Sequence, residues 1–126
     1  MSSPFPSSAG RLLDLVETTW PRFVLLRDCV IRDRPDVDEA FEQWWDIHQD
    51  EPWHIENAMN HVHLYDFVGD DYDDSELPML ERAAEHIAEA WRAALGVQFP
   101  EHNLEVTIAT EPDEYGPTVS CHRRAS

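Results

Sequence analysis

Apolar residues recur at spacings of three and four in four stretches of the chain. Residues at these spacings lie on one side of an α-helix, so each stretch predicts a helix that buries one face. The predicted helices span 11–20, 37–48, 53–68 and 76–95. Glu51 and Pro52 suit the start of the third helix, and glycines at 69 and 96 are expected to end the third and the fourth.

The segment 23–31 fits two structures. Its apolar positions are compatible with a buried helix, whereas its β-branched residues are compatible with a strand. We favour a helix here, ended by Pro35.

After Pro100 the pattern changes to strict alternation. Leu104, Val106 and Ile108 alternate with more polar residues, and a turn-rich stretch over 111–117 separates them from a second short run at 118–121. This pattern predicts a β-hairpin. Two strands alone are marginally stable, so the hairpin must pack on helices, gain a third strand, or pair through its edge across a homodimer.

Together these patterns predict an α+β fold, with four to five helices followed by a C-terminal β-hairpin packed on them. We expect one domain over 10–126, because a chain of 126 residues is close to the usual size of one domain. The Ser- and Pro-rich residues 1–9 are expected to form a disordered N-terminal tail.

Charge limits the classes of partner. The chain holds 26 acidic and 9 basic residues, a formal charge of −17, and all the basic residues are arginines. Such a charge repels nucleic acids and anionic membranes and attracts basic proteins. We therefore expect no direct nucleic-acid binding and no membrane partner. A biased genome composition or a high-salt cytoplasm would explain the same acidity without a partner.

Cysteine content and the N-terminus indicate the compartment. The chain has only Cys29 and Cys121, it starts without a secretory pattern, and no apolar run approaches the roughly 20 residues that cross a bilayer. A reduced, cytoplasmic protein is expected.

Four histidines lie between residues 48 and 63 and suggest a metal site. On one continuous helix, His54 and His61 could share a face with Asn57 between them, whereas His61 and His63 would point about 200° apart. The alternative function is therefore a metal-dependent enzyme or a metal sensor that binds a divalent transition metal such as zinc. Its candidate ligands are Glu51, His54, Asn57, His61 and His86. No second Glu-x-x-His motif supports a di-metal site, so we favour a protein without a cofactor.

The favoured function is that of an acidic, non-enzymatic interaction protein. No nucleophile elbow or phosphate-binding loop is present, and the chain has only four glycines with which to build one. We expect the protein to bind and neutralise a basic protein partner, as an immunity protein, an antitoxin or a mimic of nucleic-acid charge does. An aromatic anchor surrounded by carboxylates would form the contact surface. The candidate contacts are Trp44, Asp46, Asp50, Glu51, Asp70, Asp71, Asp73, Asp74, Glu81, Glu85 and Glu89.

The last three of these glutamates form a row of like charges on the fourth predicted helix. The repulsion within this row is either screened by solvent or reduced by Arg82, His86 and Arg92, or else the row serves to bind a basic partner.

Overall fold

The computed structural model describes residues 8–48, 51–67, 73–109 and 116–124. The α-helices in this part of the chain are α1 (Ser8–Thr19), α2 (Val37–His48), α3 (Pro52–Met59) and α4 (Leu77–Gln98). The strands are β1 (Phe23–Leu26), β2 (Cys29–Arg32), β3 (His61–His63), β4 (Leu104–Ala109) and β5 (Thr118–Arg123). Two short 3-10 helices are η1 (Leu64–Phe67) and η3 (Asp74–Glu76). The predicted α+β class, with a C-terminal hairpin packed on helices, is confirmed.

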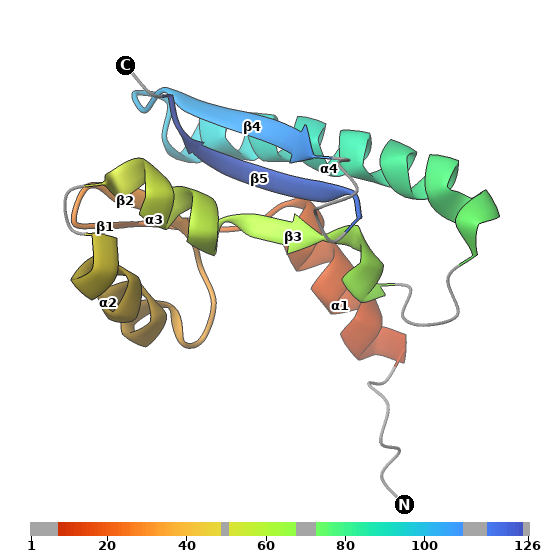
Figure 1. Cartoon of the computed structure of the whole chain (residues 1–126), viewed down its shortest axis with the longest axis horizontal. Coiled ribbons are helices and arrows are strands. Elements are labelled where there is room, and N and C mark those ends of the chain that lie inside the picture. Colours follow the sequence, from red (N-terminus) through yellow and green to blue (C-terminus); the bar gives the residue numbers. More distant parts are fainter. Residues whose placement is uncertain (1–7, 49–50, 68–72, 110–115, 125–126) are drawn as a thin grey trace, which may run out of the picture.

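The C-terminal hairpin belongs to a three-stranded antiparallel sheet. Its strand order is β3-β5-β4, and α4 lies along one face of it (Figure 1). Val106, Val119 and Cys121 point into the core between the sheet and α4, where they surround the fully buried Trp91. The alternating pattern of β4 therefore reflects one buried face, as predicted. Strand β3 supplies the third strand that the hairpin needs.

The prediction of a helix over 23–31 is wrong. This segment forms the β1–β2 hairpin, turned by Arg27 and Asp28 with φ of +46° and +68°. Positive φ at both central residues is typical of two-residue hairpin turns that match the twist of the strands. Strand β2 lies between two core clusters: Val30 packs toward α4, whereas Cys29 and Ile31 pack toward α2 and α3. Because β2 is buried on both faces, its apolar run shows no alternation that would identify a strand.

The third and fourth predicted helices have different ends from those expected. Helix α3 starts at Pro52 as predicted but ends at Met59. Asn60 caps the helix, and its side chain and carbonyl bond to strands β2 and β5. The Asn60 side chain accepts from the Arg32 N–H and donates to the Val30 carbonyl, both at 2.8 Å, and its carbonyl accepts from the Cys121 N–H.

Gly96 does not end α4. The helix continues to Gln98, whose side chain accepts from the Phe23 N–H at 2.8 Å and donates to the Pro21 carbonyl at 3.0 Å. These tertiary bonds fix the last turn of α4. The predicted stop at Gly69 and most of the predicted tail, residues 1–7, lie outside the described residues, and Ser8 and Ala9 begin α1.

Candidate functional site

Glu56 is a fully buried carboxylate that the sequence analysis did not single out. Its Oε2 accepts from the Val30 N–H at 2.9 Å, and its Oε1 accepts from the backbone N–H and the Nε–H of Arg123 at 2.9 and 3.0 Å. Glu56 thereby joins α3 to β2 and β5. Since protein donors occupy both oxygens, its role is structural. The one sequence signal is its place beside Ile55 in the buried stripe of α3.

The two cysteines are free, buried and protonated. Burial raises the pKa of Cys29 from 9.0 to about 11, and the charge of Glu56 adds to the shift. Burial followed by the charge of Glu56 likewise raises the pKa of Cys121 to about 12. A nucleophilic cysteine needs a thiolate near neutral pH and access to substrate. Neither thiol meets these requirements.

The predicted metal ligands do not form one cluster. Glu51 Oε2 lies 3.3 Å from His54 Nε2 and 3.6 Å from His48 Nδ1. Asn57 is exposed on α3, and His86 is exposed on α4. In the described ranges, no three His, Cys, Asp or Glu side chains are placed to hold a metal ion.

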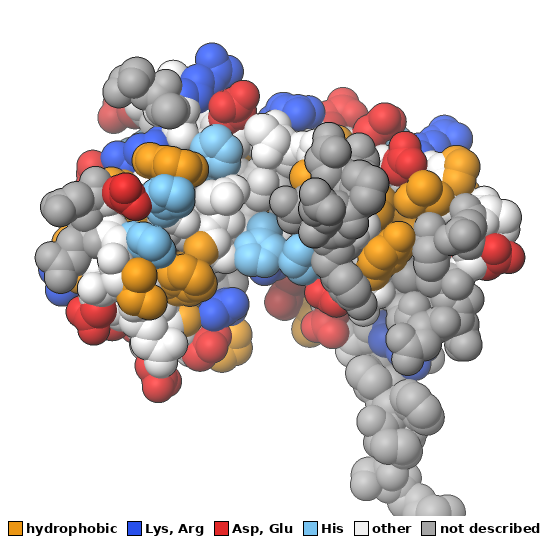
Figure 2. Space-filling view, viewed as in Figure 1, with side chains coloured by type: hydrophobic (Ala, Val, Ile, Leu, Met, Phe, Trp, Pro, Cys, Tyr) orange, Lys and Arg blue, Asp and Glu red, His pale blue; other side chains and the backbone are white. Residues whose placement is uncertain are grey.

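The predicted relation between His61 and His63 is wrong, because the helix breaks before them. Both lie in β3, where residues two apart point to the same face of the sheet, and their ring centroids are 4.9 Å apart. This face is the one turned away from α4, and Figure 2 shows His side chains gathered there over α3 and β3. His63 Nδ1 lies 2.9 Å from the Thr118 hydroxyl, which itself donates to the Gly116 carbonyl.

His61 and His63 border a hollow of about 440 Å³, here called the histidine hollow. Its other lining residues are Asn57, Ala58, Thr107, Ala109, Thr118 and Ser120. The Thr107 and Ser120 hydroxyls bond to each other at 3.0 Å across the sheet. The described lining residues offer amide, imidazole and hydroxyl groups but no carboxylate, so they provide hydrogen bonds without a fixed negative charge.

A continuous row of rings crosses the same side of the molecule. Trp44 stacks on His48, His48 on His54, and His54 on Trp53, with centroid distances of 5.8, 5.4 and 3.6 Å, and His122 meets the edge of Trp53 at 6.4 Å. The row holds α2, α3 and β5 together at the surface. The row also explains the position of Trp44, which is half-buried against the smaller core cluster.

The predicted acidic contacts are spread over several elements. Glu51 is exposed beside the row of rings, Asp46 is exposed on α2, and Asp73 is exposed just before η3. Asp74 begins η3. Three of the candidates lie outside the described residues: Asp50, Asp70 and Asp71.

The glutamate row on α4 is not neutralised within the described part of the chain. Glu85 and Glu89 are exposed and Glu81 is half-buried, and none of the three takes part in an ion pair there. Arg92, one of the expected partners, instead donates to the Val106 carbonyl at 3.1 Å. The row therefore presents uncompensated negative charge on α4.

Helix α1 turns its apolar side away from the protein. Leu12, Leu13, Leu15 and Val16 are each 46% to 62% exposed, and Thr18 is the one buried residue of the helix. The backbone carbonyl of Thr18 accepts a 2.7 Å hydrogen bond from the indole of the buried Trp91, which anchors α1 to α4. An amphipathic helix normally covers the core with its apolar side, so this arrangement leaves an outward face without a partner.

Comparison with protein-family models, with curated proteins and with solved structures gives no match for this chain. None of the helices in the described ranges has the length and apolar character needed to span a bilayer.

Proposed function

We propose that this chain is a non-enzymatic protein-binding domain, and that a basic protein covers the outward apolar face of α1. The observation that carries the proposal is the exposure of four large apolar side chains on that one helix. Contiguous exposed apolar surface on a soluble domain usually marks an interaction site. Trp20, which directly follows α1 and is 49% exposed, supplies the aromatic anchor typical of such sites.

Charge favours a basic partner over a second copy of this chain. Each copy carries −17, so self-association would bring two strongly negative molecules together. A basic partner gains attraction at long range, and the uncompensated glutamates of α4, the helix on which α1 packs, add to it. Electrostatic steering would bring the partner in, and burial of the α1 leucines would hold it. Such a complex would mask the partner's basic surface, as a neutralising protein does.

Two pairs of exposed apolar residues allow a matched test. The first variant, Leu12→Ser with Val16→Ser, removes part of the α1 face. The second, Ile47→Ser with Val97→Ser, removes side chains that are 69% and 73% exposed elsewhere on the molecule. Each protein is immobilised, exposed to lysate of the source cells at low salt and eluted in a salt gradient. We expect wild type and the second variant to retain the same basic protein in stoichiometric amount, and the first variant to lose it.

Two results would contradict the proposal. Retention of the same protein by both variants would mean that α1 is not the anchor. A wild-type dimer in light scattering that dissociates in the Leu12→Ser, Val16→Ser variant would mean that a second copy covers the face instead.

A further inference from the structure

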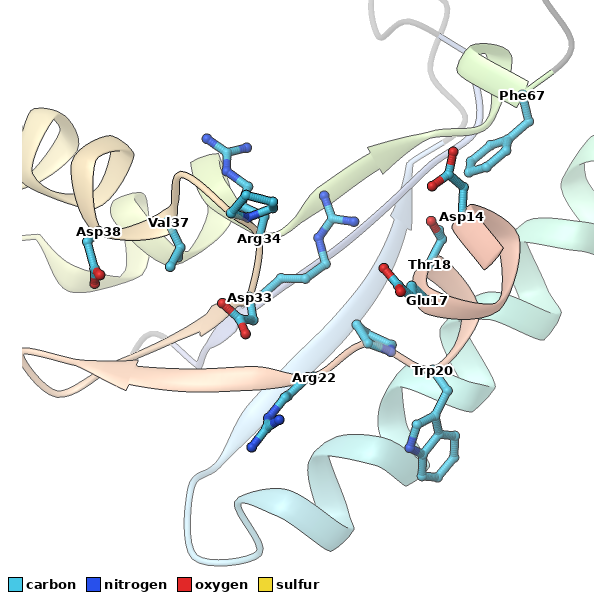
Figure 3. A pocket seen from close by; sticks show the side chains of 13 residues that line it. Asp14, Glu17, Thr18, Trp20, Arg22, Asp33, Arg34, Val37, Asp38 and Phe67 are labelled. Atoms are coloured by element: carbon cyan, nitrogen blue, oxygen red, sulfur yellow. The ribbon is translucent and has the colours of Figure 1, made fainter. Parts of the chain in front are cut away.

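A second concave site lies on the other side of α1. It is a pocket of about 930 Å³ between α1 and the segment that joins β2 to α2. Figure 3 shows Asp14, Glu17 and Thr18 of α1 on one wall, across from Asp33 and Arg34. At 100° per residue, Asp14 and Thr18 lie on the side of α1 opposite to Leu12 and Val16, whereas Glu17 lies about 40° from Leu13. The pocket therefore opens away from Leu12 and Val16 and borders the apolar face at Glu17 and Trp20.

Arg32 is a pocket residue whose charge has no counter-ion among the residues that the structure describes. Its Nε is buried and has no hydrogen-bond partner, and its Nη2 reaches only the His61 carbonyl, at 3.5 Å. Burial lowers the pKa of Arg32, and the neighbouring charge of Arg34 lowers it further. Within the described ranges no carboxylate forms an ion pair with Arg32, although the chain has 26 acidic residues. A half-buried guanidinium in this state would be stabilised by an anion delivered into the pocket.

The charges around the pocket restrict what that anion can be. Among the described residues, four carboxylates and three guanidinium groups line it, a formal charge of −1. A net anion such as phosphate would be repelled both by this lining and by the charge of the whole chain. A zwitterion has no net charge, so it escapes the long-range repulsion and can still pair with both signs at close range.

We propose that this pocket binds a zwitterionic, amino-acid-like molecule with an apolar side chain. Its carboxylate pairs with the guanidinium of Arg32, whose planar fork suits that group, and its ammonium pairs with Asp14 and Glu17 on the opposite wall. Trp20 and Phe67 line the pocket at opposite ends of the α1 wall, and the apolar side chain is received at the Trp20 end (Figure 3). A pocket of this volume accommodates a molecule of amino-acid size.

The test uses L-phenylalanine and two analogues that each lack one charge, 3-phenylpropanoate and 2-phenylethylamine. Nitrogen-15 NMR of the full chain follows the Arg32 Nε–H and the Trp20 indole N–H during titration. We expect saturable shifts of both signals with L-phenylalanine, and at least tenfold weaker binding of either analogue. Arg32→Gln is expected to abolish the binding.

Because Arg32 is half-buried, a second variant uses exposed positions. The double variant Asp14→Asn, Glu17→Gln should bind L-phenylalanine as weakly as 3-phenylpropanoate. The control Glu85→Gln, Glu89→Gln changes the net charge by the same amount and should leave the affinity for L-phenylalanine unchanged. The proposal is overturned if L-phenylalanine produces no saturable shift, if 3-phenylpropanoate binds as tightly as L-phenylalanine, or if the two double variants behave alike. Trp20 belongs to both proposed sites. The substitutions at Leu12 and Val16 that test the apolar face leave Trp20 in place, so the two tests remain distinguishable.

Discussion

Among single residues, Glu56 is a buried charge that joins separate parts of the chain. Its carboxylate accepts hydrogen bonds from residues 26 and 67 positions away in sequence, and no part of it reaches solvent. It also holds the pKa of Arg123 above its usual value despite the opposing effect of burial. The carboxylate is thus the acceptor that fixes β2 and β5 on α3.

Replacing Glu56 by Gln should lower the free energy of unfolding by about 3 kcal/mol. The amide keeps the shape of the side chain, but it replaces one acceptor oxygen by a donor that faces N–H groups. It also removes the nearer of the two charge partners of the Arg123 guanidinium. Urea denaturation measures the change. Glu85→Gln, at an exposed position without an ion pair in the described part of the chain, is the matched control and should change the free energy by less than about 0.5 kcal/mol. Equal effects of the two substitutions would show that the Glu56 bonds are not important for stability.

At the scale of structural elements, replacing Gly96 or Gly116 by alanine should change the stability of the protein in opposite directions. Gly96 lies inside α4, and a Cβ added there would meet no atom within 4 Å, so Gly96→Ala should stabilise the protein by about 1 kcal/mol through better helix propensity. Gly116 has φ of +67°, and a Cβ there would collide with the ring of Tyr65. Gly116→Ala should therefore destabilise it by at least about 2 kcal/mol.

Thermal unfolding of both glycine variants provides the measurement, and each serves as the control for the other. A fall in Tm for Gly96→Ala would mean that the helix is strained at that point and that Gly96 is a local break, as the sequence first suggested. An unchanged Tm for Gly116→Ala would contradict the close approach of Tyr65.

Two of the elements that sequence patterns identify, α4 and β4, have one buried face. Helix α4 and strand β4 each show the period of their structure because one side packs on the core and the other meets solvent. Strand β2 is buried on both sides, so periodicity could not separate it from a helix. Strand β3 is only three residues long and depends on its pairing with β5, which no local pattern encodes.

The candidate sites were predictable only in part. Composition alone gave the net charge, which supports the choice of a basic partner. The amphipathic pattern of α1 predicted a buried apolar side, whereas the structure turns that side outward. The bond between the Trp91 indole and the carbonyl of Thr18 fixes α1 in this orientation, and the opposite wall of the pocket comes from Arg32 and the segment that joins β2 to α2. Neither is visible in the local sequence.

At the scale of the whole molecule, negative charge is poorly compensated. The basic residues number 9 against 26 acidic ones, and one of the arginines, Arg123, is shared between Glu56 and Asp28. Repulsion among the remaining carboxylates acts against the compact state and is strongest where salt is low. The same charges that would attract a basic partner therefore reduce the stability of the free protein.

Salt should consequently act in opposite directions on folding and on binding. Raising NaCl from 10 to 150 mM shortens the screening length from about 30 to 8 Å, so the free protein should gain about 1 kcal/mol, or about 4 °C in Tm, while its complex with a basic partner weakens. Calorimetry of the free chain measures the first effect. The variant Glu81→Gln, Glu85→Gln, Glu89→Gln should start with a higher Tm and gain less from salt. A Tm that does not change with salt in either protein would show that self-repulsion is negligible, and the acidity would then affect only encounter with a partner.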